Sequence, residues 1–450
     1  MAPREGFKSS MGVLLAMVGS AVGLGNLWRF PYLMGTNGGA AFIIVYLGFV
    51  VLLCLPVLFS EFIVGKRSHA NTYGAFRVLA PGTGWKTYGV LAVICSFLIQ
   101  SFYVVVGGWT TNYLIRSFGA NFASTDNEVM LSTFQAACGA TEVWVPLLCF
   151  LLFMALNAVI LAGGVQKGIE KFTRFMTPAL FVLVVVMAIY SMCLPGAGEG
   201  LRFMFRPDFS KVTVDMLQSA LGQAFLSLSL GCGCILTYAS YVKSDHNIMK
   251  TSTQTALLDT LFALLAGCAI MPAVFSFGLS PSQGPGLVFV TLPGIFAQLP
   301  AGRVVAVLFF FVVFLAALTS SISMSEVMIA YVQEEFRLGR KAAVSVCLGI
   351  ITLSGTLCSL SMGPLSGFHL FGFTIFDFCD YVSSNIFMPV GGLLIVIFVG
   401  WYLKKDVVME ELTNGGTIRW PRWLLNLVFF LMRFVSPLIL LVLLVGSLVG

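Results

Sequence analysis

Residues 19–31 read GSAVGLGNLWRFP and interrupt an apolar helical pattern that runs from Met11 to about Thr36. The centre of the stretch is Gly-x-Gly followed by Asn. A membrane helix can be broken only where its freed backbone groups find partners in protein, water or a ligand. The break therefore predicts a ligand site, in which amides of one half-helix face an anion and carbonyls of the other face a cation. Helix packing through small residues is the alternative explanation.

The composition is that of a helical membrane protein. Of the 450 residues, 58% are hydrophobic and only 10% are charged, whereas soluble domains average roughly 25% charged residues. The mean hydropathy is +0.96, and apolar runs of about 20 residues recur. The net charge of +6 reflects basic loops between these runs, so it does not indicate nucleic-acid binding. The eleven cysteines lie mostly inside apolar runs, without the spacing of a disulfide framework or a zinc site.

Two of the predicted membrane helices carry interruptions. The sixth, like the first, contains Gly-x-Gly within an apolar run, at residues 223–233 (QAFLSLSLGCG). Paired interruptions at corresponding positions of two halves are the best sequence indication of a transporter site. They favour an inverted repeat of five plus five helices, with helices one and six unwound at mid-membrane. About eleven spans are predicted, at 11–36, 40–65, 87–116, 143–163, 172–194, 215–242, 254–278, 302–333, 342–360, 374–403 and 423–448.

The fold class is thus an all-α membrane protein, and the basic residues predict its orientation. Lys and Arg concentrate in loops on one side of the predicted membrane, which is typical of the cytoplasmic side. We expect a multi-pass protein of the cell inner (plasma) membrane, with a cytoplasmic N-terminus and an external C-terminus. The Pro/Gly-rich segment 280–301 is then an external lid candidate with a short helix. The predicted parts are a cytoplasmic segment 1–10, a first repeat 11–194, a second repeat 215–403, and a C-terminal loop and helix 404–450.

Several motifs together resemble the neurotransmitter:sodium symporter family. The resemblance implies sodium-coupled secondary active uptake of amino acids by alternating access, with an amino-acid substrate and a lipid bilayer as partners and no nucleic acid. The family often has twelve helices, one more than this chain. The matching pieces are residues 19–31, Asn37-Gly38-Gly39, Gly222-Gln223-Ala224-Phe225, 227–231 (SLSLG), 237–241 (TYASY) and Leu318-Thr319-Ser320-Ser321.

The resemblance implies two sodium sites, of which one (Na2) lies between helices one and eight. Freed carbonyls and a hydroxyl pair offer hard oxygen ligands to a dehydrated monovalent ion. Back-bonding of the two hydroxyls to the preceding helical turn is the alternative, since Ser and Thr often do this in membrane helices. The matching positions are the carbonyls of Gly19, Val22 and Ala316 and the hydroxyls of Thr319 and Ser320.

The other implied sodium site (Na1) touches the substrate, at Ala21, Asn26, Ser227 and Asp259. The family usually has Asn where this chain has Asp259. An ionisable residue inside an apolar span costs roughly 2.5–3.5 kcal/mol unless it is paired, so we expect Asp259 to face the bundle interior. A protonated Asp that hydrogen-bonds a neighbouring helix is the alternative.

Asp259 also bears on chloride. Animal relatives hold a chloride near this sodium through Tyr, Gln, Ser and Asn, and many bacterial relatives replace it by a Glu one turn further along helix seven. The matching residues here are Tyr46, Gln223 and Ser227, but the one-turn-on position is Ala263. We therefore expect ionised Asp259 to supply the negative charge, so that transport needs two sodium ions and no chloride.

The resemblance places the substrate carboxylate at the amides of Leu24 and Gly25 and the hydroxyl of Tyr103, where the positive end of a half-helix suits an anion. Leu226 and Cys232 stand where the family often has Phe, so the pocket should admit bulky hydrophobic or aromatic amino acids. Phe225 could instead refill the space, and transport of small aliphatic amino acids stays an alternative. The complete substrate set is Ala21, Leu24, Gly25, Ile99, Tyr103, Val106, Leu226, Ser227, Ser229, Cys232, Ser320 and Met324.

Charged residues at the two ends match the gates of the family. Arg29 and Asp380 match the external gate above the substrate, where pairing directly or through water is economical. Arg4 and Glu334 match the internal gate, although the family usually has Asp at the latter position and Trp where this chain has Phe7. Ser240 and Tyr241 support the internal gate.

Other function classes fit the sequence less well. The three histidines, His69, His246 and His369, are not placed beside a nucleophile or in metal spacing, so an enzyme is not expected. No short repeated filter of an ion channel is visible. An amino-acid sensor on the same fold stays an alternative, and it would bind the amino acid without accumulating it.

Overall fold

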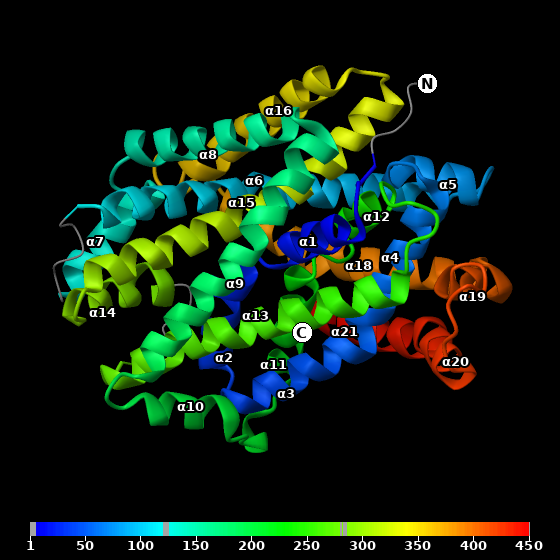
Figure 1. Ribbon diagram of the computed structural model, residues 1–450. Coiled ribbons are helices and arrows are strands. Elements are labelled where there is room, and N and C mark those ends of the chain that lie inside the picture. The colour runs from blue at the N-terminus through cyan, green and yellow to red at the C-terminus, as the bar shows by residue number, and fades with distance from the viewer. Residues whose placement is uncertain (1–5, 120–125, 280, 282–285, 450) are drawn as a thin grey trace.

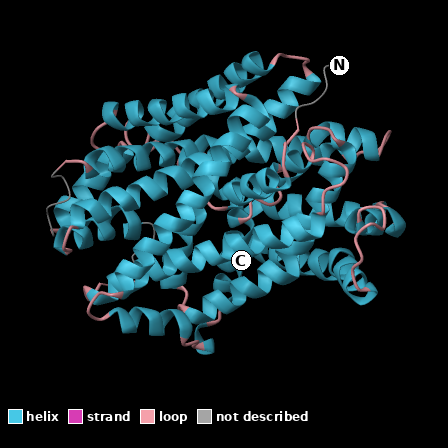
Figure 2. Cartoon of the chain, in the orientation of Figure 1, coloured by secondary structure: helices cyan, strands magenta, loops and turns pink. Residues whose placement is uncertain are grey.

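The computed structural model describes residues 6–119, 126–279, 281 and 286–449. Figure 1 shows a bundle whose long helices run from one end of the molecule to the other. Throughout the described ranges the chain consists of helices and loops, with one isolated bridge inside loop 361–374 (Figure 2). The all-α prediction is therefore confirmed.

Nine helices of the described chain are long and apolar enough to cross a membrane, and a bent pair makes a tenth. An interrupted pair, α11 and α12, occupies the position of the predicted sixth span. The nine are Ala40–Ser68 (α3 Ala40–Phe49, η2 Val50–Cys54, α4 Leu55–Ser68), Lys86–Ser117 (α6), Trp144–Ala162 (α8), Val165–Met192 (η3 Val165–Glu170, α9 Lys171–Met192), Ile248–Ser276 (α13), Gly302–Glu335 (α15), Arg340–Leu360 (α16), Ile375–Tyr402 (α17 Ile375–Tyr381, η6 Val382–Phe387, α18 Met388–Ile397, η7 Phe398–Tyr402) and Arg422–Gly446 (α20 Arg422–Phe430, η8 Leu431–Val435, within α21 Ser436–Val449).

The first span is broken where the sequence predicts it. α1 (Ser10–Ala21) ends at Val22, whose φ of −71° and ψ of 97° leave the helical region. The chain resumes as η1 (Gly25–Arg29) and α2 (Phe30–Thr36), and the two parts meet at 46°. The Val22 amide makes the last helical hydrogen bond, to the carbonyl oxygen of Val18 over 2.7 Å. The next two amides, of Gly23 and Leu24, donate instead to side chains, those of Asn26 and Tyr103.

The sixth span is interrupted over six residues. α11 (Val214–Ser227) and α12 (Cys234–Ala239) are separated by a stretch in which Ser229, Gly231 and Gly233 have φ of 52°, 76° and 81°. Left-handed backbone favours glycine, and a Cβ on Gly231 would also lie 2.1 Å from the carbonyl oxygen of Met388. The Gly-x-Gly pair is therefore a steric requirement of the break.

Long helices hold the broken pair at the centre of the bundle. α15 packs along α6, and α9 packs along α13. α1 contacts α9, α13 and α15, and Figure 1 shows it among them. The two interruptions meet between these helices, where Ser229 Oγ donates to the carbonyl oxygen of Ser20 over 3.1 Å.

Shorter helices lie at the two ends. The α7 end, at the left of Figure 1, carries α7 and α14, and the α5 end, at the right, carries α5 and α19. The short helix expected in segment 280–301 is confirmed as η5 with α14, whereas residues 280 and 282–285 lie outside the described ranges. The bounds are α5 Thr72–Leu79, α7 Asn127–Cys138, α10 Ala197–Phe205, η4 Phe209–Lys211, η5 Leu287–Thr291, α14 Leu292–Gln298 and α19 Lys405–Thr413.

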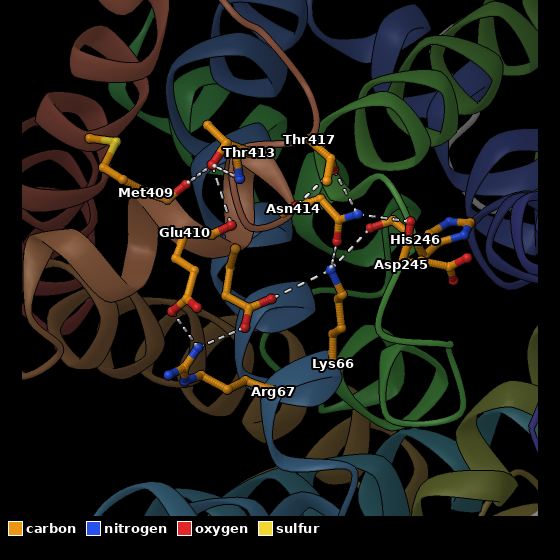
Figure 3. A network of polar contacts seen from close by, with 11 residues as sticks. Lys66, Arg67, Asp245, His246, Met409, Glu410, Thr413, Asn414 and Thr417 are labelled. Carbon is orange, nitrogen blue, oxygen red and sulfur yellow. Dashed lines mark hydrogen bonds and ion pairs between the residues drawn. The ribbon is translucent and has the colours of Figure 1, made fainter.

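A polar network fixes α19 to the bundle at the α5 end (Figure 3). Lys66, at the end of α4, donates from Nζ to the carbonyl oxygen of His246 over 3.1 Å and to Oδ1 of Asn414 over 3.0 Å. Its ammonium also lies 3.5 Å from Oε2 of Glu411. Arg67 pairs with the same carboxylate at 2.8 Å. The network joins the ends of α4, α13 and α19, three segments far apart in the sequence.

Candidate ion and substrate site

Asp259 is the centre of a buried polar cluster where four helices meet. Asn26 of η1 donates from Nδ2 to Asp259 Oδ1 over 2.8 Å, and Ser227 of α11 donates from Oγ to Oδ2 over 2.7 Å. Tyr46 of α3 donates from its hydroxyl to Oδ2 over 3.4 Å. Asp259 is fully buried. The structure thus brings together three of the predicted Na1 residues, and two residues of the cluster, Tyr46 and Ser227, are among those that match the chloride site.

Gln223 completes the surroundings of this cluster. Its Nε2 donates to the carbonyl oxygen of Gly25 over 2.8 Å, at the start of the second half of the broken helix. Its Oε1 is buried without a hydrogen-bond partner among the described residues. Gln223 lies one turn before Ser227 in α11. Buried polar atoms are normally satisfied, so an oxygen left in this way suits a cation or a water molecule.

The predicted Na2 residues of helices one and eight also approach one another. Thr319 Oγ1 lies 3.5 Å from the carbonyl oxygen of Val22 and 3.0 Å from that of Ala316. Thr319 Oγ1 also donates to the carbonyl oxygen of Leu315 over 3.1 Å. The same hydroxyl therefore makes the hydrogen bond to the preceding helical turn that was the alternative explanation. Ser320 Oγ donates to the carbonyl oxygen of Ser20 over 3.1 Å. On Gly19, a Cβ would lie 2.8 Å from Thr177 Oγ1, so the Cα of this residue packs closely against α9.

A cavity lies next to the first break, on its α7 side. Tyr103 of α6 accepts a hydrogen bond from the Leu24 amide over 3.2 Å, so the predicted carboxylate-binding groups are adjacent. The cavity measures about 40 Å³, room for a few water molecules at roughly 10–15 Å³ each. An amino acid therefore needs the lining side chains to move apart. Five predicted substrate residues line it: Leu24, Gly25, Tyr103, Val106 and Leu226.

Four aromatic side chains of the lining were not predicted: Trp28, Tyr32, Phe102 and Phe376. Phe376 stacks on Trp109, with ring centroids 5.6 Å apart, and meets Phe102 edge-on at 5.5 Å. Trp28 contacts Phe289 of η5 at 6.1 Å. Rings from η1, α2, α6 and α17 thus close the cavity. Of the four residues, only Trp28 lies in a stretch that the sequence marked, residues 19–31.

The remaining predicted substrate residues lie outside the cavity lining. Ser229 and Ser320 both donate to the carbonyl oxygen of Ser20, each over 3.1 Å, and so connect the two broken helices with α15. Cys232 is buried and donates from Sγ to the carbonyl oxygen of Ser229 over 3.2 Å. Phe225 packs on Gly392, where a Cβ would lie 2.4 Å from its ring. Ala21, Ile99, Ser227 and Met324 are buried in the surrounding packing.

The predicted external gate residues, Arg29 and Asp380, line the same cavity. No ion pair within 4.0 Å joins them in the described structure, and Arg29 Nη1 is buried without a hydrogen-bond partner there. Asp380 accepts from Ser384 Oγ over 3.0 Å. Both charged side chains therefore line one cavity. This arrangement suits an interaction through a water molecule, or a direct ion pair once the cavity closes.

At the α5 end, Glu334 accepts two hydrogen bonds of 2.9 Å from the backbone and side-chain amides of Asn71, the N-cap residue of α5. Arg4, its predicted partner, lies outside the described residues. The carbonyl oxygen of Tyr241 accepts from the Phe7 amide over 3.0 Å, and the Phe7 ring meets that of Tyr241 edge-on. Phe7 thus contacts the predicted gate residue Tyr241 through both its backbone and its ring.

The prediction missed a second ion pair at this end. Glu326 of α15 is fully buried and forms two hydrogen bonds, of 2.7 and 2.6 Å, with the guanidinium of Arg340. The Tyr241 hydroxyl donates to the same carboxylate over 2.7 Å. The predicted gate residue Tyr241 therefore contacts Glu326, and Ser240 lies beside it, donating to the carbonyl oxygen of Thr237 over 2.5 Å. The sequence signal was an acid within the apolar part of α15.

Glu61 is a further residue that sequence reasoning missed. It lies in α4, fully buried, and accepts from the amides of Gly231 over 2.6 Å and Leu236 over 3.3 Å. These amides lost their helical partners at the sixth-span break, so the carboxylate replaces the missing acceptors. Its signal was again an acid inside an apolar run.

Comparison with known proteins agrees with this geometry. The model of the sodium:neurotransmitter symporter family matches residues 4–142 and 137–450. A sodium-dependent transporter of Bacillus subtilis, YhdH, is 39% identical over 96% of this chain and 95% of its own. A sodium-dependent transporter of Haemophilus influenzae is 35% identical over 99% of this chain and 98% of its own. The crystal structure of MhsT in complex with L-phenylalanine is similar at a TM-score of 0.92 and 41% identity, covering 99% of this chain and all of the other.

More distant relatives are animal carriers. The sodium- and chloride-dependent GABA transporter 2 of Rattus norvegicus is 25% identical over 93% of this chain and 76% of its own. The similarity thus covers both interrupted helices and nearly the whole chain, and the relatives are transporters and not enzymes. The chain belongs to the sodium:neurotransmitter symporter family.

Proposed function

We propose that this sodium-coupled transporter takes up amino acids with bulky hydrophobic or aromatic side chains. The observation that carries the proposal is the meeting of two helix breaks beside a cavity lined by Tyr103, Val106 and Leu226 and closed by aromatic rings. The amides at the first break suit a carboxylate, and the apolar lining suits a large side chain. MhsT, which has L-phenylalanine bound in its crystal structure, supports this substrate class.

Two sodium ions would accompany each substrate molecule. At Na1, the ion would lie between Asp259, Ser227 and the Asn26 amide, with the amide turned so that Oδ1 faces the ion. The Ala21 carbonyl would complete this set. At Na2, the ligands would be the Val22 and Ala316 carbonyls with Thr319 and Ser320. The Gly19 carbonyl would join them.

Chloride would not be required. Asp259 places a carboxylate within 3.4 Å of the Tyr46 hydroxyl and 2.7 Å of the Ser227 hydroxyl. These are two of the side chains that match the chloride site of the animal relatives. A fixed carboxylate at this position would balance the charge of the Na1 ion, so a mobile anion would add nothing.

The amine of the substrate would face the carbonyls of Ala21, Leu226 and Ser227 and the hydroxyl of Ser229. In the described conformation Ser229 and Ser320 are occupied with the Ser20 carbonyl. Binding would therefore exchange these hydrogen bonds for contacts with the substrate. The hydroxyl groups keep a partner in this exchange, whereas the Ser20 carbonyl loses the donors that it has in the described conformation.

The energetics allow steep accumulation. Each sodium ion contributes about 2.3 kcal/mol per 100 mV of membrane potential, and a tenfold gradient adds about 1.4 kcal/mol per ion. For two ions the sum is roughly 7 kcal/mol, enough for about a 10⁵-fold substrate gradient.

The orientation follows from the basic loops. Lys66, Arg67, Arg77 and Arg340 all lie at the α5 end, which we place in the cytoplasm because Lys and Arg concentrate on that side. The N-terminus would be cytoplasmic and the C-terminus external, in the plasma membrane. Asn71, Glu326 and Glu334 would then form the cytoplasmic gate, and Arg29 with Asp380 the external one.

Uptake into proteoliposomes tests the proposal. Purified protein with an inward sodium gradient should accumulate radiolabelled L-phenylalanine, and replacing sodium by potassium should abolish uptake. Replacing chloride by gluconate on both sides should leave the rate unchanged. Sodium-dependent binding without accumulation would instead identify a sensor, and preferred uptake of alanine would identify a carrier of small aliphatic amino acids.

A further inference from the structure

Two cysteines lie face to face behind the wall of the cavity. Cys358, two residues before the end of α16, and Cys379, in α17, have their sulfur atoms 4.0 Å apart. Cys358 is fully buried and Cys379 is 7% exposed. They are 21 residues apart in the sequence and come from neighbouring helices at the α7 end.

The backbone around the pair is fixed on both sides. Ser361 Oγ donates to the Cys358 carbonyl over 2.7 Å and accepts from the Phe376 amide over 3.2 Å. Ser383 Oγ donates to the Cys379 carbonyl over 2.6 Å. The ends of α16 and α17 are therefore already joined beside the sulfurs, so side-chain rotation is the main movement that a bond between them requires.

We propose that Cys358 and Cys379 form a reversible disulfide that ties the external gate wall to α16. Cys379 lies between two residues that line the cavity: Asp380 directly follows it, and Phe376 lies three residues before it. α16 packs on α6, α8 and α15, which are unbroken helices. The bond would fix the position of the gate acid relative to these helices. The gate role rests on the proposed function, whereas bond formation does not.

The reaction is an exchange with a small-molecule disulfide such as oxidised glutathione. The thiolate of Cys379, the more exposed sulfur, attacks the S–S bond and releases one glutathione thiolate. Cys358 then loses its proton, and its sulfur attacks Cys379 in the mixed disulfide, which releases the second thiolate. The two cysteine protons end on the two released thiols, and the two electrons reduce the small molecule. The oxidising external side of a membrane would favour this direction.

Alkylation of a single tryptic peptide tests the bond. No Lys or Arg lies between Lys341 and Lys404, so one peptide carries Cys347, Cys358 and Cys379. After treatment of the folded protein with oxidised glutathione, then denaturation and alkylation, this peptide should carry one alkyl group instead of three. Dithiothreitol should restore all three. Three groups after oxidation would overturn the proposal.

Matched variants locate the bond. Cys358→Ser should leave one alkyl group, on Cys347, and a mixed disulfide of Cys379 with glutathione, whereas Cys347→Ser should leave neither an alkyl group nor glutathione on the oxidised peptide. The pair Cys232 and Cys234, with sulfurs 3.5 Å apart, is an internal control. It lies in the buried break, with one residue between the two cysteines, and should keep both alkyl groups.

Thermal unfolding of the wild-type chain tests whether the disulfide stabilises the fold. The oxidised protein should unfold at a higher temperature than the reduced protein, because the cross-link restricts the unfolded chain. Cys358→Ser should remove this difference, and Cys347→Ser should preserve it. Equal unfolding temperatures for oxidised and reduced wild-type protein would overturn the structural role of the bond, whatever the protein transports.

Discussion

Asn26 and Asp259 are 233 residues apart, yet the Asn26 amide lies 2.8 Å from the Asp259 carboxylate. One residue belongs to the first helix break and the other to an unbroken helix, α13. The contact links the first helix break to Asp259, which is buried and is the only carboxylate in the predicted Na1 set. A buried carboxyl group and a broken helix therefore share one polar cluster.

Asp259→Asn should make transport depend on chloride. The substitution removes the fixed negative charge but keeps the size of the side chain and one oxygen. A free anion can then bind near Tyr46, Gln223 and Ser227 to balance the sodium ion. The measurement is sodium-driven uptake in chloride and in gluconate. The wild type should take up substrate at the same rate in both salts. If the variant is active and its rate is also the same in both, the charge-balance account is contradicted.

Leu226→Phe should narrow the cavity, which Leu226 lines. Overpacking costs about 1–3 kcal/mol, so binding of tryptophan should weaken about tenfold or more, while binding of alanine changes less. Leu226→Met, which conserves volume, is the control and should bind tryptophan as the wild type does. Equal weakening of alanine and tryptophan would show that the residue supports the fold and not selectivity.

Arg340→Gln should weaken closure at the α5 end. The change leaves Glu326 buried and unpaired, and breaking one side of a buried ion pair costs about 3–5 kcal/mol. The thermal midpoint should fall, and uptake should fall with it. The double variant Glu326→Gln with Arg340→Gln should recover part of the stability, because no charge is then left buried.

The pair between Arg77 and Glu335 is the matched control. Arg77 is 61% exposed and lies 2.7 Å from its partner, and exposed pairs contribute about 0–1 kcal/mol. Arg77→Gln should therefore change stability and uptake little. An effect as large as that of Arg340→Gln would contradict the assignment of closure to the buried pair.

His246 should make stability depend on pH. Burial, followed by the nearby charge of Lys66, lowers the pKa of His246 from 6.5 to about 4, while Asp245 opposes this. Its ring stacks on Phe62 and its Nε2 lies 2.7 Å from Thr251 Oγ1. Between pH 6.5 and about 4 the unfolded chain binds the proton and the folded chain does not, so stability falls as pH falls.

The measurement is the thermal midpoint across that window. His246→Asn should lose less stability than the wild type on acidification, because the variant has no group that titrates at this position. His69→Asn, at an exposed position of the same end, should behave as the wild type does. A steeper loss in His246→Asn would reverse the predicted sign.

The sequence allowed prediction of features that carry a local signal. Gly231 and Gly233 mark the sixth-span break because their left-handed backbone favours glycine. Asp259 was predicted to face the interior because a charge within an apolar run needs a partner. Both predictions follow from the cost of an unsatisfied group in a membrane.

Features that depend on packing between distant segments could not be predicted. Phe102 and Phe376 are ordinary apolar residues in the sequence, and only their meeting beside Tyr103 makes them cavity walls. Glu334 was paired with Arg4 from the resemblance, and its contact with Asn71 depends on where α5 begins. Glu61 and Glu326 did carry a signal, an acid in an apolar helix, which the prediction did not use.

The most direct test of the central claim is a competition panel on reconstituted protein. Sodium-driven uptake of radiolabelled L-phenylalanine is measured in the presence of each of the twenty amino acids. The account predicts accumulation that requires sodium and is inhibited most by tryptophan, phenylalanine and leucine, with glycine and alanine weak. Accumulation without sodium, or stronger inhibition by alanine than by tryptophan and leucine, would contradict it.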